Sequence, residues 1–402
     1  MADTPRPLRG LPMRRDDRFA PATGLAELRD RHPISPMIYP DGHRGWLVTG
    51  HDLAREVLSS PHFSNRPELL HSPLDAPLPT QERPQTQPGF FLNMDPPDHT
   101  RLRRMLTGQF TVKRMRALEP RVEAIVAERI DAVLAAGPPA DLVAEFALPV
   151  PSLVICELLG VDYDDRDGFQ TDSHTLMDLR VPVEERIAAR ERIGAFMLRT
   201  AHRKRGRPDD GLLGSLVHSG ELDDAELAGV GFLMLLAGHE TTANMLALGT
   251  FALLEHPDQA ELLRARPALM PQAVEELMRF LSIVHMGPTR CATADVRIDG
   301  RLVTAGSNVT VSVPAANHDP RRFDGPDRLD VTRPGTGHVG FGHGVHQCLG
   351  QQPARPEMRI GFDALLRRLP GLALAVDAKA VPMRSDMGLY GVHELPVTWR
   401  QE

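Results

Sequence analysis

The sequence predicts a mainly α-helical protein with small β-sheets, an α+β arrangement, from three observations. Apolar residues recur at helical spacing through most of the chain, short β-like runs lie near its two ends, and no repeat or low-complexity array is present. The 402 residues are 42% apolar, which is enough for a large core. Because no linker divides the chain convincingly, we expect residues 1–402 to form a single domain.

The expected elements follow from these patterns in chain order. Helical spacing predicts helices over residues 25–31, 52–59, 99–106, 114–136, 148–159, 184–205, 224–255, 259–266, 272–280 and 357–369. The β-like runs are "GWLVTG", "DVRIDG", "RLVTAG", "NVTVSV" and "LPVTW". Residues 67–88 are rich in proline and glutamine and have no period, so we expect a long loop there that is a lid or is mobile.

Charge and cysteine content narrow the class of protein. A formal net charge of −7 argues against nucleic acid as the main partner. Cys156, Cys291 and Cys348 are too few and too scattered for a disulfide framework, which favours a reducing cytoplasm. No secretory h-region and no run of about twenty apolar residues is visible. We therefore expect a soluble cytoplasmic protein that does not enter a membrane.

The longest expected helix, over residues 224–255, begins with a capping box formed by Asp223 and Glu226. Its centre, "GFLMLLAGHETTANMLALG", is apolar nearly all round and should lie in the core. Glu240 and Thr241 are conspicuous there, because buried polar groups need partners. The structural interpretation of Thr241 is a hydroxyl bonded to the carbonyl one turn earlier.

The segment "GFGHGVHQCLG", residues 340–350, allows three interpretations: a phosphate-binding loop, a zinc site or a thiolate ligand to haem iron. The dinucleotide fingerprint fails, since its third glycine would fall at Val345 or Gln347. Structural zinc normally has four ligands with paired cysteines, and only one thiol is present here beside His343 and His346. An axial thiolate needs a helix N-terminus, amide donors and small neighbours, and Phe341, Gly342, Gly350 and the helix expected after Cys348 meet these demands.

The stretch "FGHGVHQCLG" resembles the haem-binding signature of the cytochrome P450 superfamily, in its soluble bacterial branch. The resemblance implies haem b (iron protoporphyrin IX) lying between the long central helix and the loop of Cys348, the axial ligand. "AGHETT", residues 237–242, is similar to the family's acid–alcohol motif. By this resemblance Thr241 would act on bound dioxygen, Glu240 would gate protons toward it, and Gly238 would permit a local widening of the helix.

The same resemblance assigns residues that hold the haem and the scaffold. His99, Arg103, Arg290 and His346 match the propionate ligands, although a solvated basic helix would also explain the first two. Glu276 and Arg279 match a buried pair to which Arg328 would be the third member, while Glu261 and Arg264 repeat the same spacing as a decoy. Pro353 and Pro356 depart from the pattern, because a proline in a helix interior costs about 3 kcal/mol. We therefore expect a kinked or delayed helix after Cys348.

The resemblance implies a monooxygenase that hydroxylates or epoxidises a hydrophobic substrate in secondary metabolism or xenobiotic oxidation. It also implies that the protein is a monomer. Electrons would come from a ferredoxin and its NAD(P)H-dependent reductase. A basic run could face that partner or be plain solvated surface; it comprises Arg101, Arg104, Lys113, Arg114 and Arg116. By position, an apolar substrate pocket would draw on Phe90, Phe91, Leu233, Ala237, Val284, His285 and Leu389. A haem-thiolate peroxygenase or isomerase, a haem-based sensor and a zinc hydrolase remain as alternatives.

Overall fold

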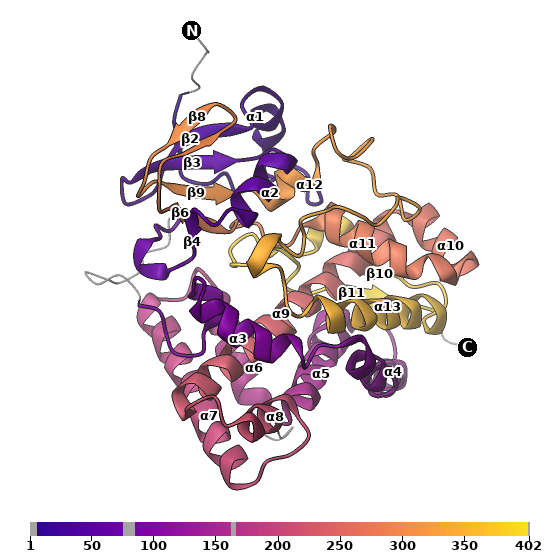
Figure 1. Cartoon of the computed structure of the whole chain (residues 1–402). Helices are drawn as coiled ribbons and strands as arrows, with labels where there is room; N and C mark the ends of the chain where they lie inside the picture. Colours follow the sequence, from indigo (N-terminus) through magenta and orange to yellow (C-terminus); the bar gives the residue numbers. More distant parts are fainter. Residues whose placement is uncertain (1–5, 75–84, 162–165, 401–402) are drawn as a thin grey trace.

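The computed structural model describes residues 6–74, 85–161 and 166–400, which form a helical body with the largest β-sheet on one side and strands β10 and β11 on the other, near α11 and α13 (Figure 1). Part of the expected loop at residues 67–88 lies outside these ranges. The helices in chain order are α1 (Leu25–Arg31), α2 (His51–Ser59), α3 (Asp98–Thr107), α4 (Val112–Ala136), α5 (Pro149–Leu159), α6 (Arg166–Met177), α7 (Val183–Gly206), α8 (Leu212–Ser219), α9 (Asp224–Glu255), α10 (Pro257–Ala265), α11 (Met270–Leu281), α12 (Val313–Asn317) and α13 (Gln351–Arg368).

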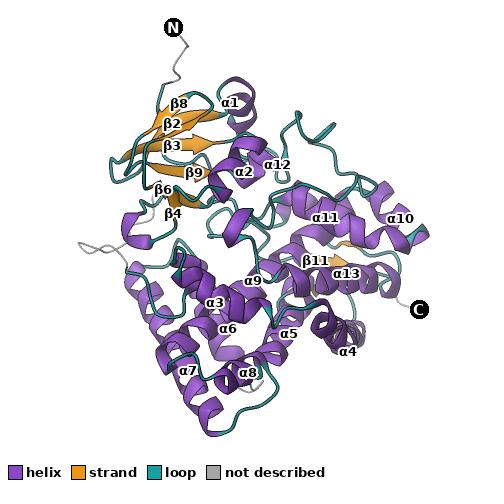
Figure 2. Cartoon of the chain, viewed as in Figure 1, coloured by secondary structure: helices purple, strands orange, loops and turns teal. Residues whose placement is uncertain are grey.

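A six-stranded mixed sheet lies beside the helices, at the upper left of Figure 2. Its spatial order is β1-β2-β3-β9-β6-β4, with bounds β1 (Leu8–Arg9), β2 (Ile34–Ile38), β3 (Arg44–Val48), β9 (Asn308–Val311), β6 (Thr289–Ala292) and β4 (Phe63–Ser64). β3 and β9 pair in parallel, with Trp46 opposite Val309, so segments far apart in the sequence share one sheet. Two smaller sheets contain β10 (Ala373–Leu374), β11 (Pro396–Thr398) and β5 (Ala140–Asp141), and β7 (Val296–Ile298) and β8 (Arg301–Val303). The predicted mainly helical fold with small sheets is confirmed.

Helix α9 joins two hydrophobic cores. Its N-terminus is capped as predicted: the carboxylate of Asp223 accepts a hydrogen bond of 2.8 Å from the Glu226 amide, and that of Glu226 accepts one of 3.3 Å from the Asp223 amide. Val230 and Leu235 pack in one core with α3, α7 and α8, whereas Leu246 and Phe251 pack in the other with α4, α11 and α13. None of the helices in the described ranges is long and apolar enough to cross a membrane.

Helix α13 starts at Gln351, so the expected delayed start at residue 357 is wrong. Pro353 lies in the first turn, where a helix needs no N–H donor. Pro356 lies inside the helix and removes one hydrogen bond to the carbonyl of Gln352, a residue that is exposed to water. Burial of Pro353 and Met358 offsets that loss, because tertiary packing supplies most of a helix's stability.

Candidate functional site

The loop that carries Cys348 is shaped by glycines and by backbone hydrogen bonds. The amide of Cys348 donates to the carbonyl of Phe341 over 2.8 Å and closes the loop just before α13. Gly342 and Gly344 have φ angles of 72° and 74°, which glycine adopts without strain. A Cβ at Gly344 would lie 2.4 Å from the carbonyl oxygen of Leu58, so only glycine lets the loop pack this closely on α2.

The thiol of Cys348 lies at the N-terminus of α13, where backbone amides point toward it. The residue is accessible to solvent, yet its sulfur is surrounded by enough protein that burial raises its pKa. Hydrogen bonds from the amides of Gly350 and Gln351 act in the opposite direction and favour the thiolate. Because burial outweighs these donors, the thiolate needs further positive charge, such as that of a ligated metal ion. The site therefore fits an axial ligand to iron.

Four basic side chains converge in front of this loop. The rings of His99 and His346 lie 4.2 Å apart between centroids, and Arg103 donates to the carbonyl of Gln347 over 2.5 Å. Burial and the charges of Arg290, His99 and Arg103 together lower the pKa of His346 to about 3. We call these four residues the cationic cluster.

The cationic cluster lacks a counter-charge of its own within the described ranges. Arg290 is only 6% exposed and donates to the side chain of Asn65 over 2.7 Å, but no carboxylate lies within ion-pair distance of Arg103 or Arg290 in that part of the chain. Both ring nitrogens of the buried His99 are without a partner there. Burial lowers the pKa of Arg290 to about 10, which is costly for a cation without an anion. The arrangement fits the two carboxylates of a haem, so the predicted propionate ligands are brought together.

Glu240 and Thr241 lie on α9, beside the one accessible stretch of its middle. Ala237 is exposed between the half-buried Leu236 and Gly238, and the hydroxyl of Thr241 donates to its carbonyl over 2.8 Å. The structural interpretation of Thr241 is thus confirmed, although the hydroxyl oxygen can still accept a hydrogen bond. Gly238 does not widen the helix, which stays α-helical; a Cβ there would lie 2.7 Å from Ile155, so the glycine allows α5 to approach.

Arg384, which the sequence did not single out, forms a buried ion pair with Glu240. Its Nη1 atom lies 3.3 Å from the Glu240 carboxylate and 3.0 Å from the side-chain oxygen of Asn244. Its Nη2 atom donates to Nδ1 of His174 over 3.1 Å. Burial and the charge of Arg384 lower the pKa of His174, which accepts this hydrogen bond as a neutral imidazole. Arg384 therefore holds the side chain of Glu240 in place between α9, α6 and the C-terminal loop.

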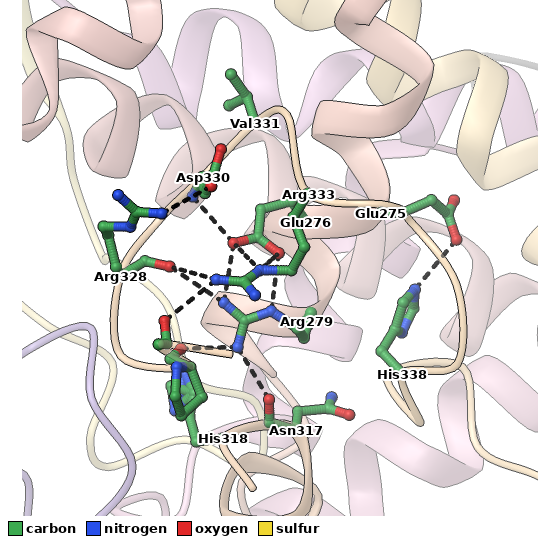
Figure 3. A network of polar contacts seen from close by, with 12 residues as sticks. Glu275, Glu276, Arg279, Asn317, His318, Arg328, Asp330, Val331, Arg333 and His338 are labelled. Carbon is green, nitrogen blue, oxygen red and sulfur yellow. Dashed lines mark hydrogen bonds and ion pairs between the residues drawn. The ribbon is translucent and has the colours of Figure 1, made fainter. Parts of the chain in front are cut away.

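A second buried cluster, shown in Figure 3, surrounds Glu276 on α11. Arg279 donates to both oxygens of Glu276 over 2.8 and 2.9 Å, so the predicted contact is confirmed. The third member is Arg333, whose Nε lies 3.1 Å from the same carboxylate. The amide of Asp330 also donates to it over 3.0 Å. We call Glu276, Arg279 and Arg333 the glutamate cluster.

The assignment of Arg328 to this cluster is wrong. Its side chain is 75% exposed and pairs with Asp330 at 3.0 Å, pointing away from Glu276 in Figure 3. Only its backbone carbonyl takes part, accepting from Arg279 over 3.3 Å. Two arginines stand five residues apart in "DRLDVTR", and their spacing alone did not separate the buried one from the exposed one.

The predicted pocket residues differ in exposure. Ala237 is exposed and Phe90 and Val284 are half-buried, whereas four are buried: Phe91, Leu233, His285 and Leu389. The ring of Phe91 lies 6.2 Å from that of His99, and the Nε2–H of His285 donates to the carbonyl of Met387 over 2.8 Å. Burial lowers the pKa of His285 to about 4, so this histidine is neutral.

The segment at Pro88 and Gly89, which leads to the predicted pocket residues Phe90 and Phe91, packs closely against α9 because two glycines face each other. A Cβ at Gly89 would lie 2.0 Å from the carbonyl oxygen of Glu226, and one at Gly229 would lie 1.9 Å from that of Pro88. Neither position can hold a side chain without moving one backbone away from the other. The two glycines therefore set the distance between α9 and the segment that continues into Phe90 and Phe91.

The zinc alternative finds no ligand set in the part of the chain that the structure describes. There, no group of three or more His, Cys, Asp and Glu side chains is arranged to hold a metal ion.

Comparison with known proteins gives matches over nearly the whole chain. A family model described as cytochrome P450 matches residues 195–371. Cytochrome P450-SU2 of Streptomyces griseolus is 48% identical over 381 residues, covering 95% of this chain and 94% of that protein. Pentalenic acid synthase of Streptomyces avermitilis is 45% identical and covers 95% of each chain. The crystal structure of CYP105P1 in complex with filipin I has a TM-score of 0.91 at 40% identity, covering 98% of this chain and all of that one.

Proposed function

This chain belongs to the cytochrome P450 family and is therefore a monooxygenase with haem b as its cofactor, and we propose that it hydroxylates or epoxidises a hydrophobic organic substrate, in secondary metabolism or in xenobiotic oxidation. The cationic cluster carries the proposal: the buried Arg290 and the half-buried Arg103 lie beside the loop of Cys348, and neither has a carboxylate within ion-pair distance among the described residues. Cys348 would be the axial ligand, and His99, Arg103, Arg290 and His346 would bind the propionates. We treat residues 1–402 as one domain in this proposal.

The chain's own residues would divide the work as follows. Haem b supplies the oxygen-activating chemistry when bound. Gly350 and Gln351 stabilise the sulfur through their amides, while Phe341 and Gly342 shape its loop. Thr241 offers a hydroxyl beside the accessible surface of Ala237, and Glu240 holds a carboxylate one residue away for proton delivery. The pairing of Glu240 with Arg384 favours an oxygenase over a haem sensor, which would not need a buried acid at this point of α9.

The reduced protein under carbon monoxide gives the first test of Cys348. We expect the long-wavelength Soret band of thiolate ligation, and its loss in Cys348→Ala. Turnover with a ferredoxin and its reductase then separates an oxygenase from a sensor, and turnover with peroxide alone would favour the peroxygenase alternative. Thr241→Ala should consume oxygen without forming product; full coupling in that variant would remove Thr241 from the mechanism.

A ferredoxin would dock on the basic surface formed by the end of α3 and the start of α4. Arg104, Lys113, Arg114 and Arg116 are exposed there, whereas Arg101 is paired with Glu226. Reversing the charges of Arg104 and Arg116 should slow reduction at low salt, because association of charged proteins depends on long-range attraction. The haem spectrum should not change. Unaltered reduction kinetics would eliminate this surface as the docking site.

The substrate is proposed by class only. The predicted pocket residues are mostly apolar, which supports a hydrophobic molecule. The relatives support the same class: one is named pentalenic acid synthase, and another was crystallised with filipin I. A spin-state titration against a library of polyketides, terpenoids and xenobiotics would identify binders. A cytoplasmic, monomeric enzyme completes the proposal, and sedimentation of the purified protein tests its monomeric state.

A further inference from the structure

Glu275, the neighbour of Glu276, belongs to a separate network that reaches the Cys348 loop. Its Oε1 accepts from Nε of Arg355 over 2.6 Å, and its Oε2 accepts from Nη2 of Arg355 over 3.0 Å and from Nε2 of His338 over 3.1 Å. Although burial opposes ionisation, hydrogen bonds from His338 and Arg355 hold the pKa of Glu275 at about 2. One carboxylate thus ties α11 to α13 and to the segment before Cys348, as Figure 3 shows for Glu275 and His338.

Both partners of Glu275 touch the residues that shape the loop. The guanidinium carbon of Arg355 lies 4.5 Å from the ring centroid of Phe341, a cation–π contact. Nδ1 of His338 accepts a hydrogen bond of 3.0 Å from the amide of Gly340. The carbonyl of Phe341 in turn accepts from the amide of Cys348. A chain of direct contacts therefore runs from Glu275 to the residue that bears the thiol.

Arg355 also adds positive charge near the sulfur. Its Nη1 donates to the carbonyl and the side-chain oxygen of Gln351 over 3.3 and 3.0 Å, in the turn whose amides face Cys348. Its charge favours the thiolate form of Cys348. A bidentate arginine–carboxylate pair has a fixed geometry, so Glu275 determines where this charge lies.

Helix α13 offers a matched comparison one turn further on. Arg359 is 34% exposed, against 35% for Arg355, and donates to a carboxylate of α4, that of Glu119, over 2.9 Å. Both arginines pair with a glutamate on another helix, but within the described residues only Arg355 contacts the ring of Phe341. A purely structural role for such pairs would make the two equivalent.

We propose that Glu275, Arg355 and His338 are positioning residues that hold Phe341 and Cys348 in the geometry for iron ligation, and that Arg355 raises the reduction potential of the bound haem. The inference rests on the proposed role of Cys348 as the axial ligand. A cation near the sulfur withdraws electron density from the iron and favours its reduced form, since nearby charge and hydrogen bonding tune such potentials. Loss of the anchor loosens the loop, and loss of the charge lowers the potential.

The experiment compares holoenzyme variants Glu275→Gln, Arg355→Met, Arg355→Lys and the control Arg359→Met. The first readout is the rate at which the reduced carbon monoxide complex loses its thiolate band. We expect Glu275→Gln and both Arg355 variants to lose it about tenfold faster than wild type, since each breaks a charge-assisted hydrogen bond. Arg359→Met should match wild type.

The second readout, the midpoint potential, separates charge from anchoring. Arg355→Met should shift the ferric–ferrous equilibrium about tenfold toward ferric, which is about 59 mV for one electron. Arg355→Lys keeps the charge and should restore most of the potential while still losing the thiolate band quickly. A structural role alone would lower the unfolding midpoint of each variant. It would not make the midpoint potentials of Arg355→Met and Arg355→Lys differ.

Several outcomes would overturn the inference. Equal band-loss rates and midpoint potentials for Arg355→Met and Arg359→Met would mean that the Arg355–Glu275 pair, like Arg359–Glu119, has no role in iron ligation. If Arg355→Met does not accumulate as holoenzyme, the near-isosteric Glu275→Gln decides, and a wild-type rate of band loss in that variant rejects the proposal. Failure of the proposed function looks different: wild type itself would then show no thiolate band.

Discussion

The glutamate cluster and the cationic cluster each contain two arginines, of which Arg279 and Arg290 are buried, but they balance charge differently. Around Glu276, Arg279 and Arg333 share one carboxylate, and Arg279 also donates to the carbonyls of Asn317 and Pro326 over 2.9 and 2.8 Å. Around His346, Arg103 and Arg290 have no carboxylate within ion-pair distance in the described ranges.

This difference distinguishes a cluster that stabilises the fold from one that we propose binds the cofactor. A buried charge is tolerated when it is paired and hydrogen-bonded, and a paired cluster can therefore stabilise the fold by itself. A cluster that keeps its cations buried without an anion costs stability until a ligand supplies the charge. We therefore expect substitutions in the glutamate cluster to act on folding, and those in the cationic cluster to act on cofactor retention.

The largest effect is expected from Arg279→Met. It leaves the carboxylate of Glu276 buried with one partner fewer, which costs about 3–5 kcal/mol of unfolding free energy. Urea unfolding of the holoenzyme, followed by circular dichroism, measures this loss. Arg328→Met is the control, since the exposed side chain should contribute no more than about 0.5 kcal/mol. If Arg328→Met were as destabilising as Arg279→Met, our assignment of Arg333, rather than Arg328, as the third member of the glutamate cluster would be incorrect.

Arg290→Met should weaken haem binding more than folding. Loss of one charge-assisted hydrogen bond to a propionate costs about 1.5–3 kcal/mol, which is about a 10- to 100-fold faster transfer of haem to an acceptor protein. The control is Arg104→Met, an exposed arginine on the same helix as Arg103. An unchanged transfer rate in Arg290→Met would mean that the cationic cluster does not hold the cofactor.

Arg384→Met extends the comparison to α9, where a single arginine pairs with Glu240. Without it the carboxylate stays buried beside only the ring of His239, whose Nε2 lies 3.7 Å away, and proton delivery should become poorly controlled. We expect oxygen consumed per product formed to rise about tenfold, because positioned acid–base groups contribute at least that much. Hydrogen peroxide release measures it. Arg180→Met, near the same loop but exposed, should leave coupling unchanged, and equal coupling in both variants would deny Arg384 a role.

Acid sensitivity should be the smallest effect and should differ between the clusters. Burial and the charges of Arg279 and other arginines lower the pKa of His318 to about 3, as burial and its basic neighbours do for His346. Since histidine has a pKa of about 6.5 in unfolded chains, the unfolded state takes up protons first. Stability is therefore complete above pH 6.5 and is lost as pH falls toward 3, by about 1 kcal/mol per pH unit for each group.

Haem should change the contribution of His346 to the pH dependence of stability, but not that of His318. The propionates that we propose beside His346 would favour its protonated form, whereas His318 lies next to Arg279 of the glutamate cluster. In holoenzyme, His318→Asn should flatten the loss of stability between pH 7 and 5, and His346→Asn should have little effect. If His346→Asn flattened the loss of stability and His318→Asn did not, the propionates would not lie beside His346.

The sequence predicted those parts of the molecule whose causes are local. The bounds of α9 followed from a capping box and from a proline that begins the next helix, and both lie within a few residues of the ends. The Cys348 loop was predictable because its glycines, two of which have positive φ, and its single cysteine lie close together in the sequence. Strands such as β1 and β4 were not, since each consists of two residues and exists only through its partner strand.

The missed site residues depend on contacts between distant segments. Arg384 meets Glu240 across 144 positions, and no spacing rule connects them. Arg333 and Arg328 are chemically identical in the sequence, and the turn between them decides which one is buried. Glu275 was hidden by its neighbour: the E-x-x-R spacing drew attention to Glu276, although both glutamates are bound to arginines.

The glycine contact between Pro88–Gly89 and Gly229 has a consequence for engineering this enzyme. A methyl group at position 229 would force the two backbones apart and displace Phe90 and Phe91, two residues of the proposed pocket, without changing their side chains. Selectivity at the proposed pocket could thus be changed by alanine or serine at Gly229, whereas Gly89, with a φ of 75°, would also be strained by any side chain.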